Sequence, residues 1–150
     1  MALGSWNNQQ ILAQLDSGTS WSGNTITYAF PTTIAGIYGT DEHDGFTPLT
    51  AAQKSAATLA LQLWDDLITP NFQYTTSTTS DIEFGSSNTG VSYAHAYFPE
   101  EGSVWFNRGY AELTSPMTDS YGFMTYIHET GHALGLEHMG DYNGEGATPS

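Results

Sequence analysis

A run of three histidines constrains this 150-residue chain more than any other part of its sequence. Between Tyr121 and His138 the chain reads YGFMTYIHETGHALGLEH, which contains the pattern H-E-x-x-H-x-x-G-x-x-H. In a helix a four-residue step is slightly more than one turn, so His128 and His132 project from one face about 5.4 Å apart. That spacing suits two imidazoles that bind one metal ion. The stretch therefore predicts a helix that carries a metal site.

The glycine of this pattern predicts where the helix ends. In a continued helix His138 would lie about 9 Å beyond His132 along the axis and on another face, too far away to share its ion. Glycine readily takes the positive φ at which helices commonly end, so we expect the chain to turn back at Gly135. His138 then approaches the same ion. Three neutral imidazoles fill three positions of zinc and leave at least one for water, which distinguishes catalytic from closed structural sites.

Glu129 is the candidate general base. It points about 100° away from its neighbour His128 around the helix, so it lies beside the ion rather than on it. Zinc acidifies a bound water, and a nearby carboxylate can accept the proton while a polarised carbonyl is attacked. A bare H-E-x-x-H arises by chance on ordinary helices, but here five specified positions coincide. The sequence therefore predicts zinc ligands at His128, His132 and His138 and a catalytic carboxylate at Glu129.

The composition excludes several classes of partner. Sixteen acidic side chains face only Lys54 and Arg108, which gives a formal net charge of −14. Phosphates and anionic lipids repel such a chain, so we expect no nucleic-acid partner, and no apolar run is long enough to span a membrane. The acidity is typical of a solvated surface. Calcium association is the open alternative, although no EF-hand loop or glycine-aspartate repeat specifies a Ca²⁺ site.

Two further helices are predicted upstream. Residues 7–15 form a short helix capped by Ser5, with Ile11, Leu12 and Leu15 expected to face the core. A longer helix begins at Thr50, has Gln53 at capping-box spacing and extends toward Pro70. Its expected buried stripe comprises Ala52, Ala56, Leu59, Ala60, Leu63, Trp64 and Leu67.

Five extended segments complete an α+β pattern. Residues 25–30, 72–77, 81–85, 91–98 and 103–107 are rich in β-branched and aromatic side chains or alternate in polarity. The last two are separated by a tight connection, so we expect them to pair antiparallel. Residues 32–48 predict a loop, in which His43 is interpreted as a solvated histidine rather than a fourth ligand.

The segment HETGHALGLEH, followed by GDYNGEG, resembles the metzincin metalloproteases and, within them, the serralysin-type secreted bacterial peptidases. The order of elements is similar to the metzincin, or zincin-like, upper subdomain. The resemblance implies a twisted mixed sheet of about five strands with an antiparallel edge strand. The sheet packs on two long helices, one of which carries the zinc motif. It also implies a Zn²⁺-dependent endopeptidase that acts outside the bacterial cell.

The resemblance implies a substrate site on the edge strand. An extended protein or peptide substrate would bind there by adding a strand, which makes Val91, Tyr93, Ala94, His95, Ala96 and Tyr97 candidate substrate-binding residues. A plain edge strand without a partner is the alternative. In matrix-type relatives a histidine at the place of His95 helps to hold a structural zinc, but Trp105 stands where a further ligand is needed. We therefore expect His95 to be packed or exposed instead.

The chain departs from the family pattern after His138. We expect residues 1–150 to be a single catalytic domain without the lower subdomain, its Met-turn and C-terminal repeats, because Met139 follows the histidine too closely to be the Met-turn residue. A shortened chain, a natural fragment, or a nicked protein with the remainder as a separate chain fit equally well. The sequence is therefore compatible with two functions. The first is a zinc endopeptidase, and the second is a zinc-binding fragment that serves as a scaffold or interaction module with little or no peptidase activity.

Overall fold

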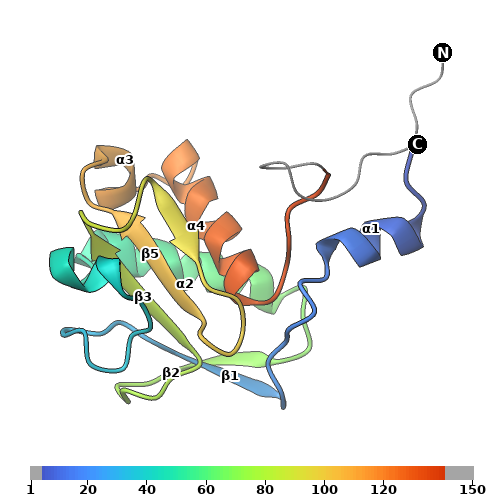
Figure 1. Ribbon diagram of the computed structural model, residues 1–150, viewed down its shortest axis with the longest axis horizontal. Helices are drawn as coiled ribbons and strands as arrows, with labels where there is room; N and C mark the ends of the chain where they lie inside the picture. The colour runs from blue at the N-terminus through green and yellow to red at the C-terminus, as the bar shows by residue number, and fades with distance from the viewer. Residues whose placement is uncertain (1–4, 141–150) are drawn as a thin grey trace.

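The computed structural model describes residues 5–140 (Figure 1). Most of the GDYNGEG stretch lies outside the described residues. The strands are β1 (Thr25–Ala29), β2 (Asn71–Tyr74), β3 (Ile82–Ser87), β4 (Ala94–Ala96) and β5 (Ser103–Asn107). The helices are α1 (Asn8–Leu15), the 3-10 helix η1 (Asp41–Gly45), α2 (Ala51–Asp65), α3 (Ala111–Thr114) and α4 (Tyr121–Ala133). No helix among the described residues has the length and apolar character needed to cross a bilayer.

The strands form one mixed sheet in the order β2-β1-β3-β5-β4. All neighbours are parallel except β4, which pairs antiparallel with β5 at the edge of the sheet. The expected α+β fold with an antiparallel edge strand is therefore confirmed. The edge strand is shorter than the predicted 91–98, because the Asn107 side chain binds the Val91 carbonyl oxygen at 2.7 Å and that of Ser92 at 3.2 Å in place of a strand ladder.

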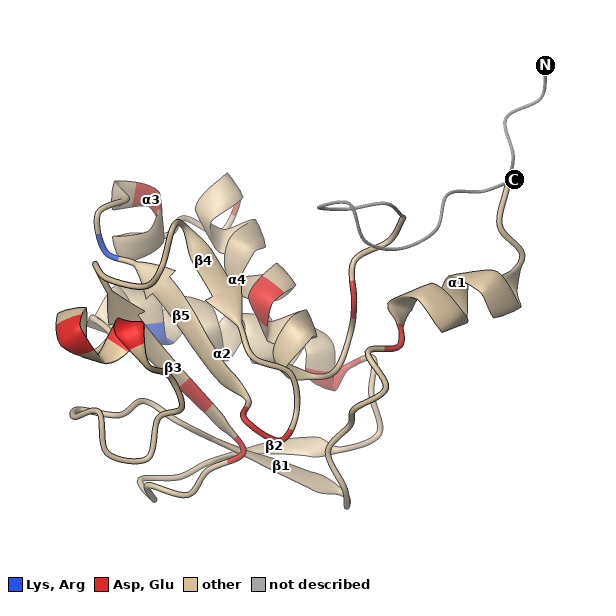
Figure 2. Ribbon diagram, viewed as in Figure 1, with Lys and Arg blue, Asp and Glu red and all other residues tan. Residues whose placement is uncertain are grey.

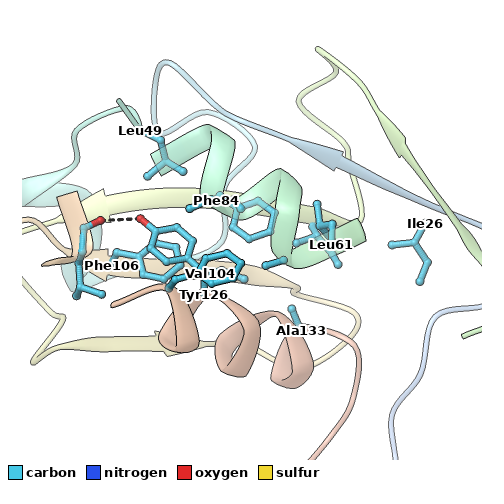
Figure 3. Close-up of a cluster of buried hydrophobic side chains, with 14 residues drawn as sticks. Ile26, Leu49, Leu61, Phe84, Val104, Phe106, Tyr126 and Ala133 are labelled. Atoms are coloured by element: carbon cyan, nitrogen blue, oxygen red, sulfur yellow. Dashed lines mark hydrogen bonds between the residues drawn. The ribbon is translucent and has the colours of Figure 1, made fainter. Parts of the chain in front are cut away.

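One face of the sheet carries the main core, which the two long helices cover (Figure 3). Side chains alternate along the strands, so Phe84, Val104 and Phe106 point to this face while Trp105 points to the other. The Tyr126 ring of α4 stacks on Phe106 with centroids 3.9 Å apart, and its hydroxyl donates to the Leu113 carbonyl oxygen at 2.7 Å. Trp105 packs beneath the chain between β1 and α2, together with Ile37 and Val91.

Helix α2 has the predicted capping box of Thr50 and Gln53. The predicted stripe is partly wrong, because the buried face is rotated: Ala52, Leu63 and Leu67 are exposed, and the buried residues are Gln53, Ala56, Ala57, Ala60 and Leu61. The second half of α2 contacts α4 through Trp64. There the Trp64 indole donates to the Ile127 carbonyl oxygen at 3.0 Å.

The prediction for the first helix was wrong in two respects. Its cap is Asn7, which forms a capping box with Gln10, rather than Ser5. None of its residues is buried, and Leu12 is 67% exposed. In Figure 1, α1 projects from the body of the molecule and approaches it through its C-terminal end. Its apolar residues therefore do not contribute to the core.

Candidate metal centre

Helix α4 places the first two histidines of the motif and then ends as the sequence predicts. Ser120 caps its first turn by accepting a hydrogen bond from the Phe123 amide at 3.2 Å. At the other end Gly135 has φ of 99°, its amide donates to the His132 carbonyl oxygen at 2.8 Å, and the Leu136 amide donates to that of Gly131 at 3.0 Å. This pair of bonds is a Schellman motif, which requires a residue with positive φ. The predicted reversal at Gly135 is confirmed.

The reversal brings the three histidines together. The Nε2 atoms of His128 and His138 are 2.9 Å apart, and each lies 3.0 Å from Nε2 of His132. The centre of such a triangle is about 1.7 Å from each nitrogen, so an ion just off its plane reaches the Zn–N distance of about 2.0–2.1 Å. Among residues 5–140, this is the one group of three His, Cys, Asp or Glu side chains close enough to share an ion.

The hydrogen bonds and the burial of the triad leave its imidazoles in a form that can bind a metal ion. His132 Nδ1 lies 2.6 Å from the Leu136 carbonyl oxygen, which can only accept, so Nδ1 carries the proton and Nε2 presents a lone pair to the centre. Burial, with the neighbouring His132 and His138, lowers the pKa of His128 to about 4. Burial and His132 also lower the pKa of His138. Both imidazoles are therefore neutral near pH 7, as metal ligands must be.

Glu129 lies on the buried flank of the triad. Its side chain is 7% exposed, and burial raises the pKa of its carboxyl to about 7. A carboxyl with that pKa exchanges a proton readily near neutral pH, which suits general acid–base chemistry. The residue lines both cavities that border the histidines.

Two adjoining cavities run between α4 and β4. One, of about 300 Å³, opens at the triad and is also lined by Ala94, His95, Ala96, Phe98 and Glu137. The other, of about 490 Å³, continues toward the start of α4 and is lined by Tyr93, Ala94, Tyr121, Met124 and Thr125 besides His128 and Glu129. The two cavities share Ala94, His128 and Glu129 in their linings and are together called the groove below. The edge strand, a carboxylate and three imidazoles border it.

The predicted substrate residues divide into two groups. Tyr93, Ala94, His95 and Ala96 line the groove, whereas Val91 is 5% exposed beneath the other face and Tyr97 lines neither cavity. The groove is also lined by residues that were not predicted to bind substrate: Phe98, Tyr121, Met124, Thr125 and Glu137. The position of Glu137 next to the third histidine is the signal that could have found it.

The other two histidines are occupied elsewhere. His43 Nε2 lies 3.0 Å from the Ile37 carbonyl oxygen, and the residue is outside the triad. His95 Nε2 lies 2.8 Å from the buried Glu42 carboxylate, which also accepts a 2.8 Å hydrogen bond from the Tyr97 hydroxyl. Burial alone would raise the pKa of Glu42, but the hydrogen bonds to its carboxylate lower it overall. These contacts tie η1 to the edge strand.

Acidic side chains are spread over η1, α3, α4 and the connections between strands (Figure 2). Within the described part of the chain they form no group of three that could share an ion. Association with Ca²⁺ stays a prediction.

Known proteins resemble this chain over most of its length. The family model described as Matrixin, Peptidase_M10, matches residues 20–143. Serralysin B of Dickeya chrysanthemi is 34% identical over 148 residues, which cover 85% of this chain and 30% of the relative. Serralysin C of the same organism is 40% identical over 123 residues, 73% of this chain and 26% of the relative. Metallopeptidase AprA of Pseudomonas marginalis is 36% identical over 135 residues, 81% and 28% respectively.

The chain therefore spans about 30% of the length of these relatives. The match covers both long helices, the whole sheet and the three histidines. The expected serralysin-like metzincin character is confirmed, and the chain belongs to the matrixin family of peptidases.

Proposed function

We propose that this chain forms the zinc-binding core of an endopeptidase that hydrolyses peptide bonds in proteins. The observation that carries the proposal is the approach of three Nε2 atoms to within 3.0 Å of one another beside a buried carboxyl. His128, His132 and His138 would hold the ion. When bound, zinc supplies Lewis-acid polarisation of the scissile carbonyl and acidifies a water.

The protein's own contribution to the reaction is proton transfer and positioning. Glu129 would accept a proton from the attacking water at its carboxylate and return it to the leaving amine nitrogen. Glu129 is buried and lines both cavities that border the histidines, which places it beside the water that it would deprotonate. His132 is held in one orientation by its Nδ1 bond to Leu136, so its ring need not be ordered when the ion binds.

The edge strand would bind the substrate in extended form. The Tyr97 amide donates to Ser103 at 2.9 Å and the Asn107 amide donates to Tyr93 at 2.8 Å, so alternate residues of the strand face β5. The backbone groups of Ala94 and Ala96 therefore point away from β5, toward the groove. A peptide that adds a strand there would lie along the triad.

Hydrolysis of casein, measured with the zinc content of the same sample, tests the proposal. We expect cleavage that a chelator abolishes and added Zn²⁺ restores. Glu129→Gln should retain zinc and lose activity by at least about 100-fold, as expected for a general base. His128→Ala should lose both. Glu101→Gln removes a charge of the same sign at an exposed position and serves as the control.

Zinc binding without cleavage would instead favour the second function, a scaffold or interaction module. Full activity of Glu129→Gln would remove the general-base role. Secretion from a bacterial cell, and a separate chain that completes the domain, stay predictions from the resemblance.

A further inference from the structure

The segment that carries His138 is held in place by a stretch more than a hundred residues earlier in the chain. The Glu137 amide donates to the Leu15 carbonyl oxygen at 2.8 Å, and the Ser17 amide donates to that of Gly135 at 3.1 Å. An isolated antiparallel bridge joins Asp16 and Leu136. Residues 15–17 and 135–137 thus form a short two-stranded ladder outside the main sheet.

Two side chains extend this ladder at its ends. Gln14 Nε2 donates to the carbonyl oxygen of His138 at 3.2 Å. The Trp21 indole donates to the carbonyl oxygen of Ala133 at 2.8 Å, and Ala133 is the last residue of α4, where helix carbonyls have no partner within the helix. The contacts therefore span the whole turn between the second and third histidines.

Of the stretch from α1 to Trp21, only the Trp21 end packs against the main core. The Trp21 ring packs against the main core, whereas no residue of α1 is buried. The same stretch packs closely against the turn after α4: a Cβ on Gly135 would collide with the Thr19 carbonyl oxygen. Because α1 buries so little apolar surface, its packing contributes little to the free energy of folding. Its C-terminal end nevertheless forms hydrogen bonds to residues 137 and 138.

We propose that residues 14–21 act as a brace that positions His138 for metal binding, with Gln14 and Trp21 as positioning residues. The inference rests on the proposed metal site. His128 and His132 are fixed by the helix, whereas His138 follows a reversal, and the contacts of residues 14–21 hold the backbone of that reversal. The brace sets the third corner of the triad and so reduces the ordering required when the ion binds.

Zinc affinity by chelator competition on the full chain tests the brace. Gln14→Leu and Trp21→Phe each remove one donor and keep most of the side-chain volume. We expect about tenfold weaker binding for each, the lower end of the range for residues that orient metal ligands. In the Co²⁺-loaded protein both should shift the visible absorption bands, which report ligand geometry and which a change in stability alone would not move.

Matched controls separate positioning from general stability. Gln9→Leu changes an exposed residue of the same helix, and Trp64→Phe removes an equivalent indole bond to the carbonyl oxygen of Ile127, before the first histidine. Both should bind zinc within twofold of the wild type. Equal affinities across all four variants, or a loss in Trp64→Phe as large as in Trp21→Phe, would overturn the brace.

Amide exchange of the metal-free protein gives a second readout. The Ser17 and Glu137 amides should exchange faster in Gln14→Leu, while those in the middle of α4 keep their protection. Unchanged exchange at both amides would also overturn the brace. If the wild type bound no zinc, the proposed metal site would fail, but this measurement would still decide whether the brace exists.

Discussion

The buried carboxyl of Glu129 should cost the metal-free protein stability at high pH. Burial raises its pKa from 4.5 to about 7, so unfolding releases a proton between these two values. Because the pKa is higher in the folded state, stability falls as the pH rises through this window and is recovered below it. Each pKa unit corresponds to about 1.36 kcal/mol, which gives a penalty of about 3 kcal/mol at pH 8 and below about 1 kcal/mol at pH 5.

Glu129→Gln removes this penalty, because an amide does not ionise. In urea unfolding with a chelator present, we expect the variant to be about 3 kcal/mol more stable than the wild type at pH 8 and nearly equal to it at pH 5. The depressed pKa of His128 acts equally in both proteins and cancels in the comparison. The exposed substitution Glu101→Gln controls for net charge. A difference below about 1 kcal/mol at pH 8, or one as large at pH 5, would refute the reasoning.

Three further substitutions test the turn, the core and the edge strand. Gly135→Ala forces a Cβ onto a positive φ and against Thr19, so urea unfolding should show a loss of about 2 kcal/mol or more and zinc titration a weaker site. Tyr126→Phe deletes the buried bond to Leu113 and should cost about 1–2 kcal/mol in the same unfolding assay, with zinc affinity unchanged. Ala96→Pro should keep zinc by elemental analysis but slow peptide cleavage at least about tenfold, since an amide directed at the groove is lost.

The sequence predicted the convergence of the three histidines better than it predicted the structure around them. Motif spacing, helix geometry and the conformational freedom of Gly135 together determine where the three imidazoles meet, and all three are local properties of residues 121–138. The capping box at Thr50 and the antiparallel pairing of β4 with β5 are likewise local or nearly so. The structure agrees with each of these predictions.

Errors arose where burial depends on distant neighbours. The spacing of Ile11, Leu12 and Leu15 is compatible with a core-facing helix, but within residues 5–140 Ile11 and Leu15 are only partly covered and Leu12 is exposed. The face of α2 was misassigned by about one residue, because alanines and leucines occur almost all round that helix and Trp64 turns toward α4. The contact of Glu42 with His95 joins residues 53 apart in the sequence, and no local pattern signals it.

The ladder between residues 15–17 and 135–137 has a consequence for the order of folding. Gln14 and His138 are 124 residues apart, so their contact closes one of the longest loops available in this chain. Closing a loop of that size has a large entropic cost, so this contact forms late in folding, after the local helices and the sheet. During synthesis, a ribosome would have to release nearly the entire described sequence before the third imidazole could reach the other two, so the cluster of three histidines would form only with the last native contacts.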